Sequence, residues 1–101
     1  MESLVKSQLN DLDEIVNIDR EAIGSDSRRN YIKKAIEEER CVAIKNEFSF
    51  VGFLIFESHF FDCSFISLII VKPTERRKGY ATSLMEYFMK TTRIPVTSVV
   101  G

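Results

Sequence analysis

The chain has 101 residues, of which 45% are hydrophobic and 29% charged, and its formal net charge is −1. These values predict one globular domain across residues 1–101. With so little net charge, no overall field would attract nucleic acid or an anionic membrane, and we expect neither as a partner. The sequence begins without a signal-like apolar region, and no apolar run approaches the ~18 residues of a membrane span, which favours a cytoplasmic protein.

The first half of the chain predicts one short strand and two helices. Residues 2–9 have a short apolar centre, as an edge strand would. Residues 12–23 carry apolar side chains at helical spacing and are followed by Gly24, a typical helix end. Ser27 is the predicted N-cap of a second helix. The buried face of that helix would consist of Tyr31, Ile32, Ala35 and Ile36.

The second half predicts four strands and one helix. Apolar, β-prone residues predict strands at 41–45, 48–56, 63–71 and 94–100. Gly52 interrupts the second of these strands and predicts a bulge or a close approach. Residues 78–90 predict an amphipathic helix whose apolar face would consist of Ala81, Leu84, Met85 and Phe88.

The resulting element order is β-α-α-β-β-β-α-β, which predicts an α/β fold. Its central strands follow one another directly and are expected to be antiparallel. The last helix lies between two strands and predicts one parallel crossover, so the sheet would be mixed.

The sequence offers little for a metal or a disulfide framework. Cys41 and Cys63 are the two cysteines, and His59 is the only histidine. Their spacing fits neither a zinc cluster nor a set of disulfides. We therefore expect no metal site and interpret both cysteines as small apolar strand residues.

The segment 68–81 combines the features of an anion site. An apolar strand ends at a proline, a turn follows with Arg76, Arg77 and Lys78, and a helix opens next to Gly79. The start of a helix presents unpaired N–H groups and the positive end of the helix dipole. Beside three cations, these donors favour a phosphate or pyrophosphate. Considered alone, the turn has an alternative interpretation as a solvated loop that caps the helix.

Element order and motif together resemble the GNAT superfamily of acyl-CoA-dependent N-acetyltransferases. That family carries Gln/Arg-x-x-Gly-x-Gly/Ala between its fourth strand and third helix, and Arg76, Gly79 and Ala81 match this pattern in the corresponding place. Its N-terminal pattern of a strand followed by Asp-Leu-Asp-Glu-Ile is similar to residues 2–23. The resemblance covers essentially the whole chain.

The resemblance implies acetyl-CoA as co-substrate and transfer of its acetyl group to a primary amine of a small molecule or a protein. Backbone N–H groups of residues 76–81 would hold the pyrophosphate, and the end of the preceding strand would pair with the pantetheine arm like an added strand. The acceptor pocket would lie between the first two helices and strands 48–56 and 63–71. The implied coenzyme-binding residues are Ile69, Ile70, Val71, Arg76, Arg77, Lys78, Gly79, Tyr80 and Ala81.

The catalytic residues are not assigned by the resemblance. Some members carry a glutamate base on the fourth strand, and the matching position here is Phe65, which cannot accept a proton. Ser67, expected on the same strand face as Ile69 and Val71, is a weak candidate for ordering a water.

Glu57, at the end of the preceding strand, is the other weak candidate for a base. Asp62 and His59 in the expected turn after it are further possibilities. An ordinary structural or surface role is the alternative for every one of these residues.

Family members usually continue past the fifth strand through another helix and two strands, so the resemblance implies a short form that ends after that strand. The helix and the tyrosine acid that this region often supplies would then be missing. The uncharged, β-prone residues 96–100 predict pairing with the same segment of a second chain, giving a homodimer. The alternative function is a non-catalytic acyl-CoA-binding or dimerisation module.

Overall fold

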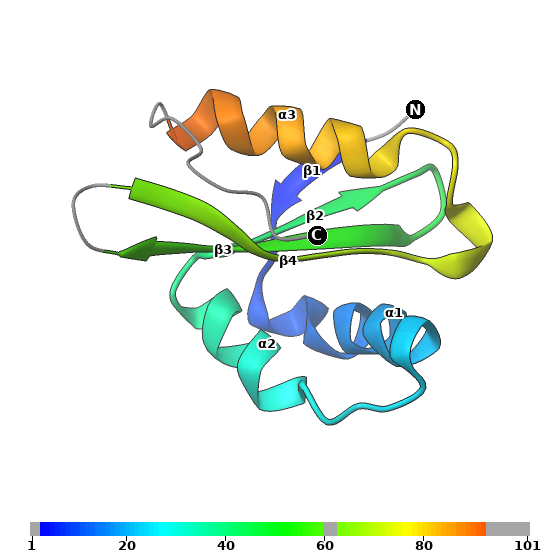
Figure 1. Ribbon diagram of the computed structural model, residues 1–101. Coiled ribbons are helices and arrows are strands. Elements are labelled where there is room, and N and C mark those ends of the chain that lie inside the picture. The colour runs from blue at the N-terminus through cyan, green and yellow to red at the C-terminus, as the bar shows by residue number, and fades with distance from the viewer. Residues whose placement is uncertain (1–2, 60–62, 93–101) are drawn as a thin grey trace.

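One antiparallel sheet lies between two layers of helices in the computed structural model, which describes residues 3–59 and 63–92 (Figure 1). The strands follow one another in sequence order, β1-β2-β3-β4, and every neighbouring pair is antiparallel. Their bounds are β1 Ser3–Lys6, β2 Cys41–Lys45, β3 Phe50–His59 and β4 Cys63–Val71. This arrangement confirms the predicted fold class.

Helices cover both faces of the sheet (Figure 1). On one face lie α1 (Leu12–Ile23) and α2 (Arg29–Glu37), and on the other lies α3 (Tyr80–Thr92). Short 3-10 helices, η1 (Leu9–Asp11) and η3 (Pro73–Glu75), precede α1 and follow β4. Over the described parts of the chain, no helix is both long and apolar enough to cross a membrane.

Three sequence predictions fall outside the described residues. These are the last strand, expected at 94–100, and the parallel crossover and homodimer contact that depend on this strand. All three stay predictions. The connection at 60–62 also lies outside the described residues.

The structure confirms the predicted end of the first helix and corrects the predicted starts of the other two. Gly24 ends α1 in the left-handed conformation, with φ 79°, and its N–H donates to Arg20 O at 2.7 Å. The predicted N-cap at Ser27 is wrong, because α2 begins only at Arg29, and the N–H of Ser27 instead donates to Ser25 Oγ. α3 begins at Tyr80, not at residue 78, because a residue with the positive φ of 81° found at Gly79 cannot continue a right-handed helix.

The sheet separates two hydrophobic clusters. α1 and α2 bury Ile15, Ile18, Ile32 and Ala35 against Phe53 and Ile55 of the sheet. α3 buries Leu84 and Phe88 against Ile44, Leu54 and Ile66 on the opposite face. Of the apolar positions predicted on α3, Leu84 and Phe88 are fully buried. They hold this helix over β3 and β4.

The connection between β2 and β3 is longer than predicted. The side-chain oxygen of Asn46 accepts the N–H groups of Phe48 and Ser49 at 2.8 and 3.0 Å. These bonds close a turn, so β3 begins at Phe50 and the side chain of Phe48 is 88% exposed. A strand start at residue 48 was therefore wrong.

Gly52 marks both a bulge and a close approach, as predicted. The register between β2 and β3 shifts between Ile44 and Lys45, next to the partner of Gly52. A Cβ at Gly52 would lie 2.9 Å from the carbonyl oxygen of Ile70, so only glycine lets β3 and β4 come this close.

A second bulge lies in β4 and leaves one extra residue in that strand. Ile55 pairs with Leu68, and the next residue, Phe56, pairs with Ile66. Ser67 is the residue left between them. Such a bulge turns two successive side chains toward the same face of the sheet.

This bulge overturns the predicted face of Ser67. Its hydroxyl contacts Tyr31 of α2, and Leu68 packs in the cluster under α1 and α2. Ile69 packs in the cluster under α3. Ser67 and Ile69 therefore lie on opposite faces, since the extra residue shifts the alternation of the strand by one.

Candidate functional site

A pocket of about 440 Å³ opens between β4 and the start of α3. In the described sheet β4 is an edge strand, so this pocket lies beside unpaired backbone. It is lined by every residue predicted to bind the coenzyme except Lys78, with Glu75 and Thr82 in addition. The lining residues are Ile69, Ile70, Val71, Glu75, Arg76, Arg77, Gly79, Tyr80, Ala81 and Thr82.

The edge of β4 offers backbone groups to this pocket. Lys72 N–H donates to Val51 O at 2.7 Å, so this residue pair is of the hydrogen-bonded kind. Such pairs alternate along an antiparallel ladder. Ile70 consequently directs its N–H and C=O to β3, whereas Ile69 and Val71 direct theirs to the open edge.

The start of α3 offers further N–H groups. The first intrahelical bond runs from Ser83 N–H to Gly79 O at 3.0 Å. The N–H groups of Tyr80, Ala81 and Thr82 precede it and have no acceptor within the helix. At Gly79, a Cβ would meet no atom within 4 Å, so the backbone there borders open space.

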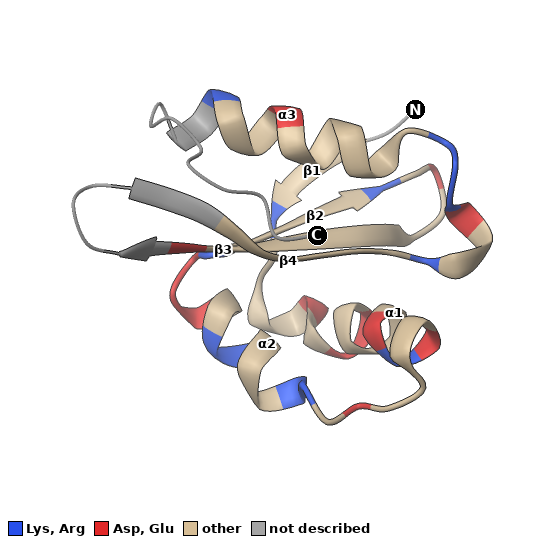
Figure 2. Cartoon of the chain, viewed as in Figure 1, with Lys and Arg blue, Asp and Glu red and all other residues tan. Residues whose placement is uncertain are grey.

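Two of the three predicted cations remain available to the pocket. Figure 2 shows these cations in the loop between η3 and α3. Lys78 does not line the pocket; its ammonium lies 2.9 Å from Glu75 Oε2, and this hydrogen bond, with the charge of Glu75, raises the pKa of Lys78. Arg76 and Arg77 are exposed in the lining, and Arg76 Nε donates to Val71 O at 3.4 Å.

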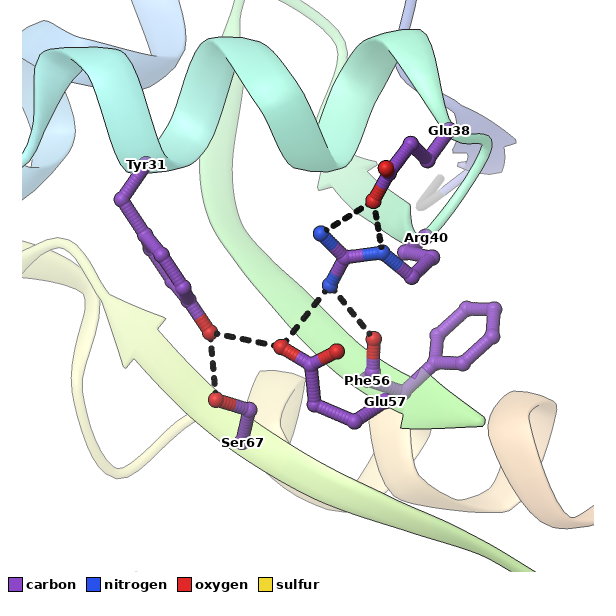
Figure 3. Close-up of polar contacts among 6 residues, drawn as sticks. All are labelled: Tyr31, Glu38, Arg40, Phe56, Glu57 and Ser67. Atoms are coloured by element: carbon purple, nitrogen blue, oxygen red, sulfur yellow. Dashed lines mark hydrogen bonds and ion pairs between the residues drawn. The ribbon is translucent and has the colours of Figure 1, made fainter. Parts of the chain in front are cut away.

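A polar network lies on the α2 side of β4 (Figure 3). The hydroxyl of Tyr31 donates to Glu57 Oε1 at 3.2 Å and lies 2.5 Å from Ser67 Oγ. Glu57 Oε1 also lies 2.9 Å from Arg40 Nη1, which donates to Phe56 O. The network thereby joins α2, β3 and the bulge of β4.

Arg40 is shared between two carboxylates. Its Nη2 lies 2.7 Å from Glu38 Oε1, and Nε donates to the same oxygen at 2.8 Å. Burial acts to lower the pKa of Arg40, but the hydrogen bond to Glu38 and the charges of Glu57 and Glu38 outweigh it, so this pKa is raised. Arg40 therefore stays charged.

A smaller pocket, of about 350 Å³, opens beside this network and is lined by Arg28, Tyr31, Ser67 and Leu68. It lies on the predicted acceptor side, between α2 and β4. In the described residues, no group of three or more His, Cys, Asp or Glu could hold a metal ion.

Comparison with known proteins identifies the family. The sequence model described as "Acetyltransferase (GNAT) family" matches residues 9–93, which is most of the chain. The chain belongs to the GNAT acetyltransferase family. Among curated proteins, none matches this sequence.

Solved structures with the same fold include a GNAT acetyltransferase from Bacillus cereus, which is 55% identical, with a TM-score of 0.83. The alignment covers 88% of the chain described here and 63% of the Bacillus protein. A PaiA N-acetyltransferase from Thermoplasma acidophilum in complex with coenzyme A is 14% identical, with a TM-score of 0.78, and the alignment covers 92% of this chain and 72% of that one. The ribosomal-protein-S18-alanine N-acetyltransferase from Escherichia coli is 18% identical, with a TM-score of 0.79, over 91% and 59% of the two chains. At these low identities, the last two show likeness of fold alone.

The GNAT fold brings together the two weak catalytic candidates, Glu57 and Ser67, through a residue that the sequence placed elsewhere. Tyr31 was predicted on the buried face of its helix, but its side chain is 37% exposed and its hydroxyl contacts both. No local pattern marks this role, because the partners lie 26 and 36 residues away in the sequence.

The other candidate bases, His59 and Asp62, stay predictions. His59 was expected in the turn but belongs to β3, where it pairs with Cys63. Asp62 lies outside the described residues. Phe65 pairs with Glu57 across the two strands.

Proposed function

We propose that this GNAT chain binds acetyl-CoA between β4 and α3 and transfers the acetyl group to a primary amine. The observation that carries the proposal is one pocket that joins an open strand edge, the start of a helix and exposed guanidinium groups. The coenzyme A bound to the Thermoplasma relative supports the choice of co-substrate.

The residues of the pocket match the chemistry of the coenzyme. The pyrophosphate would accept hydrogen bonds from the N–H groups at the start of α3, where Gly79 leaves open space. Arg76 and Arg77 would add charge-assisted contacts. The amide groups of the pantetheine arm would pair with the edge groups of Ile69 and Val71, as an added strand does.

The chemical step needs orientation above all. The amine nitrogen attacks the thioester carbonyl carbon, the C–N bond forms, the C–S bond breaks, and the thiol leaves with a proton. Holding the thioester along β4 and the amine on the other side of the strand supplies much of the rate enhancement.

A matched pair of glycine variants tests the binding site. Gly24 and Gly79 have nearly the same φ, 79° and 81°, and a Cβ at either meets open space. Gly79→Asp and Gly24→Asp therefore each place the same charged side chain at a positive φ. We expect calorimetry with acetyl-CoA to show binding by the wild type and by Gly24→Asp, and none by Gly79→Asp. Unchanged binding by Gly79→Asp would contradict the assignment.

A free-thiol assay tests turnover. The wild type is mixed with acetyl-CoA and, separately, with putrescine, with free amino acids and with a peptide that has a free N-terminal alanine. Thiol release that requires an amine supports the transferase. Binding of acetyl-CoA without thiol release from any amine would instead support a non-catalytic acyl-CoA-binding module.

A further inference from the structure

The two pockets are lined by successive residues of β4 at its bulge. Ser67 and Leu68 line the smaller pocket, and the next residue, Ile69, lines the larger one. A thioester that extends along the edge of β4 toward the bulge would therefore approach the groups that line the smaller pocket. Among these groups, the hydroxyls of Tyr31 and Ser67 can exchange a proton with an incoming amine.

The network behind the smaller pocket contains two carboxylates and one guanidinium. Arg40 is paired with both Glu38 and Glu57. Arg28 at the rim of the pocket is already paired with the buried carboxylate of Asp19, at 2.5 Å. Carboxylates near a pocket attract a cation, and a primary amine is protonated near neutral pH.

Tyr31 is the member of this network that stands between the pocket and a carboxylate. Its side chain lines the pocket, whereas Glu57 is not among the lining residues, and the side chain of Glu57 is only 17% exposed. Because the single proton of the tyrosine hydroxyl is donated to Glu57, its oxygen keeps lone pairs for Ser67 and for one further donor.

We propose that Tyr31 is a catalytic residue that takes the proton from the protonated acceptor amine and passes its own to Glu57. This inference rests on the proposed transferase function. The ammonium N–H bond breaks, its proton moves to the tyrosine oxygen, and the former hydroxyl proton moves to Glu57 Oε1. The neutral amine then attacks the thioester, its second proton leaves with the coenzyme thiol, and Glu57 returns its proton to water.

The test compares two tyrosine variants in the thiol assay at saturating acetyl-CoA. Tyr31→Phe keeps the ring and removes the hydroxyl; Tyr87→Phe removes a hydroxyl on α3, away from both pockets at β4. We expect Tyr31→Phe to lower kcat/KM for the amine by about 100-fold, which is typical of lost acid–base catalysis. Its affinity for acetyl-CoA should stay within about twofold of the wild type by calorimetry, since Tyr31 does not line that pocket. Tyr87→Phe should behave as the wild type does.

The pH profile separates proton transfer from a structural role. In the wild type, kcat/KM for the amine should level off below the pKa of the free amine, because the network removes the proton. In Tyr31→Phe, and also in Glu57→Gln, the activity should instead follow the fraction of free amine that is already neutral in solution. A profile that either variant leaves unchanged would overturn the role of Tyr31.

The two proposals fail in different ways. If the wild type released no thiol with any amine, the transferase function would be wrong and the role of Tyr31 with it. If the wild type turned over and Tyr31→Phe kept its full kcat/KM, only the role of Tyr31 would be wrong.

Discussion

Arg28 holds the buried carboxylate of Asp19 with two hydrogen bonds, from Nη2 at 2.5 Å and from Nε at 3.1 Å. The two residues join α1 to the start of α2. We expect Arg28→Ala to lower the free energy of unfolding by about 2 to 4 kcal/mol, because it leaves a buried charge without its partner. Urea denaturation measures this loss.

The adjacent residue provides the control for that prediction. Arg29 pairs with Asp13 at 2.6 Å, but the Asp13 side chain is 86% exposed. Arg29→Ala should therefore cost less than about 1 kcal/mol. Equal losses in the two variants would show that burial of Asp19 does not set the strength of the pair.

Gly52→Ala should destabilise the sheet where β3 and β4 are closest. The new Cβ would lie 2.9 Å from the carbonyl oxygen of Ile70, and backbone has to shift to accommodate it. We expect a loss of about 1 to 3 kcal/mol in the free energy of unfolding. Acetyl-CoA binding should weaken too, since Ile70 and Val71 line the larger pocket. A variant with wild-type stability and affinity would contradict the close approach.

Local signals in the sequence were sufficient for much of this fold. The apolar spacing of residues 12–23 and the glycine after them gave the bounds of α1, which the structure has at Leu12–Ile23. The strand, basic turn and helix at 68–81 likewise carry their pattern within a few residues. Such features are set by residues that lie close together in the sequence, through their apolar spacing and through the residues that begin or end a helix.

The bulge of β4 and the network behind it were not predictable in this way. A bulge is decided by the register between two strands, and nothing in residues 66–68 alone marks Ser67 as the extra residue. The partners of Tyr31 depend in turn on that register and on the packing of α2. The proposed acceptor side of the site therefore required the structure, whereas the proposed coenzyme side followed from the motif.

Stability should fall in alkaline solution because of Cys41. Burial raises the pKa of its thiol from 9.0 to about 11, so the folded state holds this proton more tightly than the unfolded chain. The stabilisation is complete below pH 9.0 and is lost as the pH rises through about 11. We expect the free energy of unfolding to fall by up to about 1.4 kcal/mol per pH unit in this window.

Cys41→Ala isolates this effect from other groups that titrate at high pH. Urea denaturation of the wild type and the variant across the same pH range gives two slopes. The slope of the variant should be shallower by the contribution of the thiol. Parallel slopes would mean that Cys41 exchanges its proton as freely in the folded state as in the unfolded chain.

Arg77 combines a left-handed backbone with a charge in the proposed coenzyme site. Its φ is 68°, a conformation that costs a non-glycine residue about 1 kcal/mol. Arg77→Gly should therefore raise the free energy of unfolding by up to about 1 kcal/mol. It should also weaken acetyl-CoA binding by about tenfold, because one charge-assisted contact to the pyrophosphate is lost.

Glu39→Gly is the matched control, since Glu39 has a φ of 59° at the end of α2 and does not line the larger pocket. Glu39→Gly should give the same gain in stability and leave acetyl-CoA affinity unchanged. Calorimetry at low and high salt then separates charge from backbone: the affinity of Arg77→Gly should depend less on salt than that of the wild type or of Glu39→Gly. If both glycine variants bound acetyl-CoA as the wild type does, Arg77 would contribute only backbone strain, and the guanidinium would have no part in holding the coenzyme.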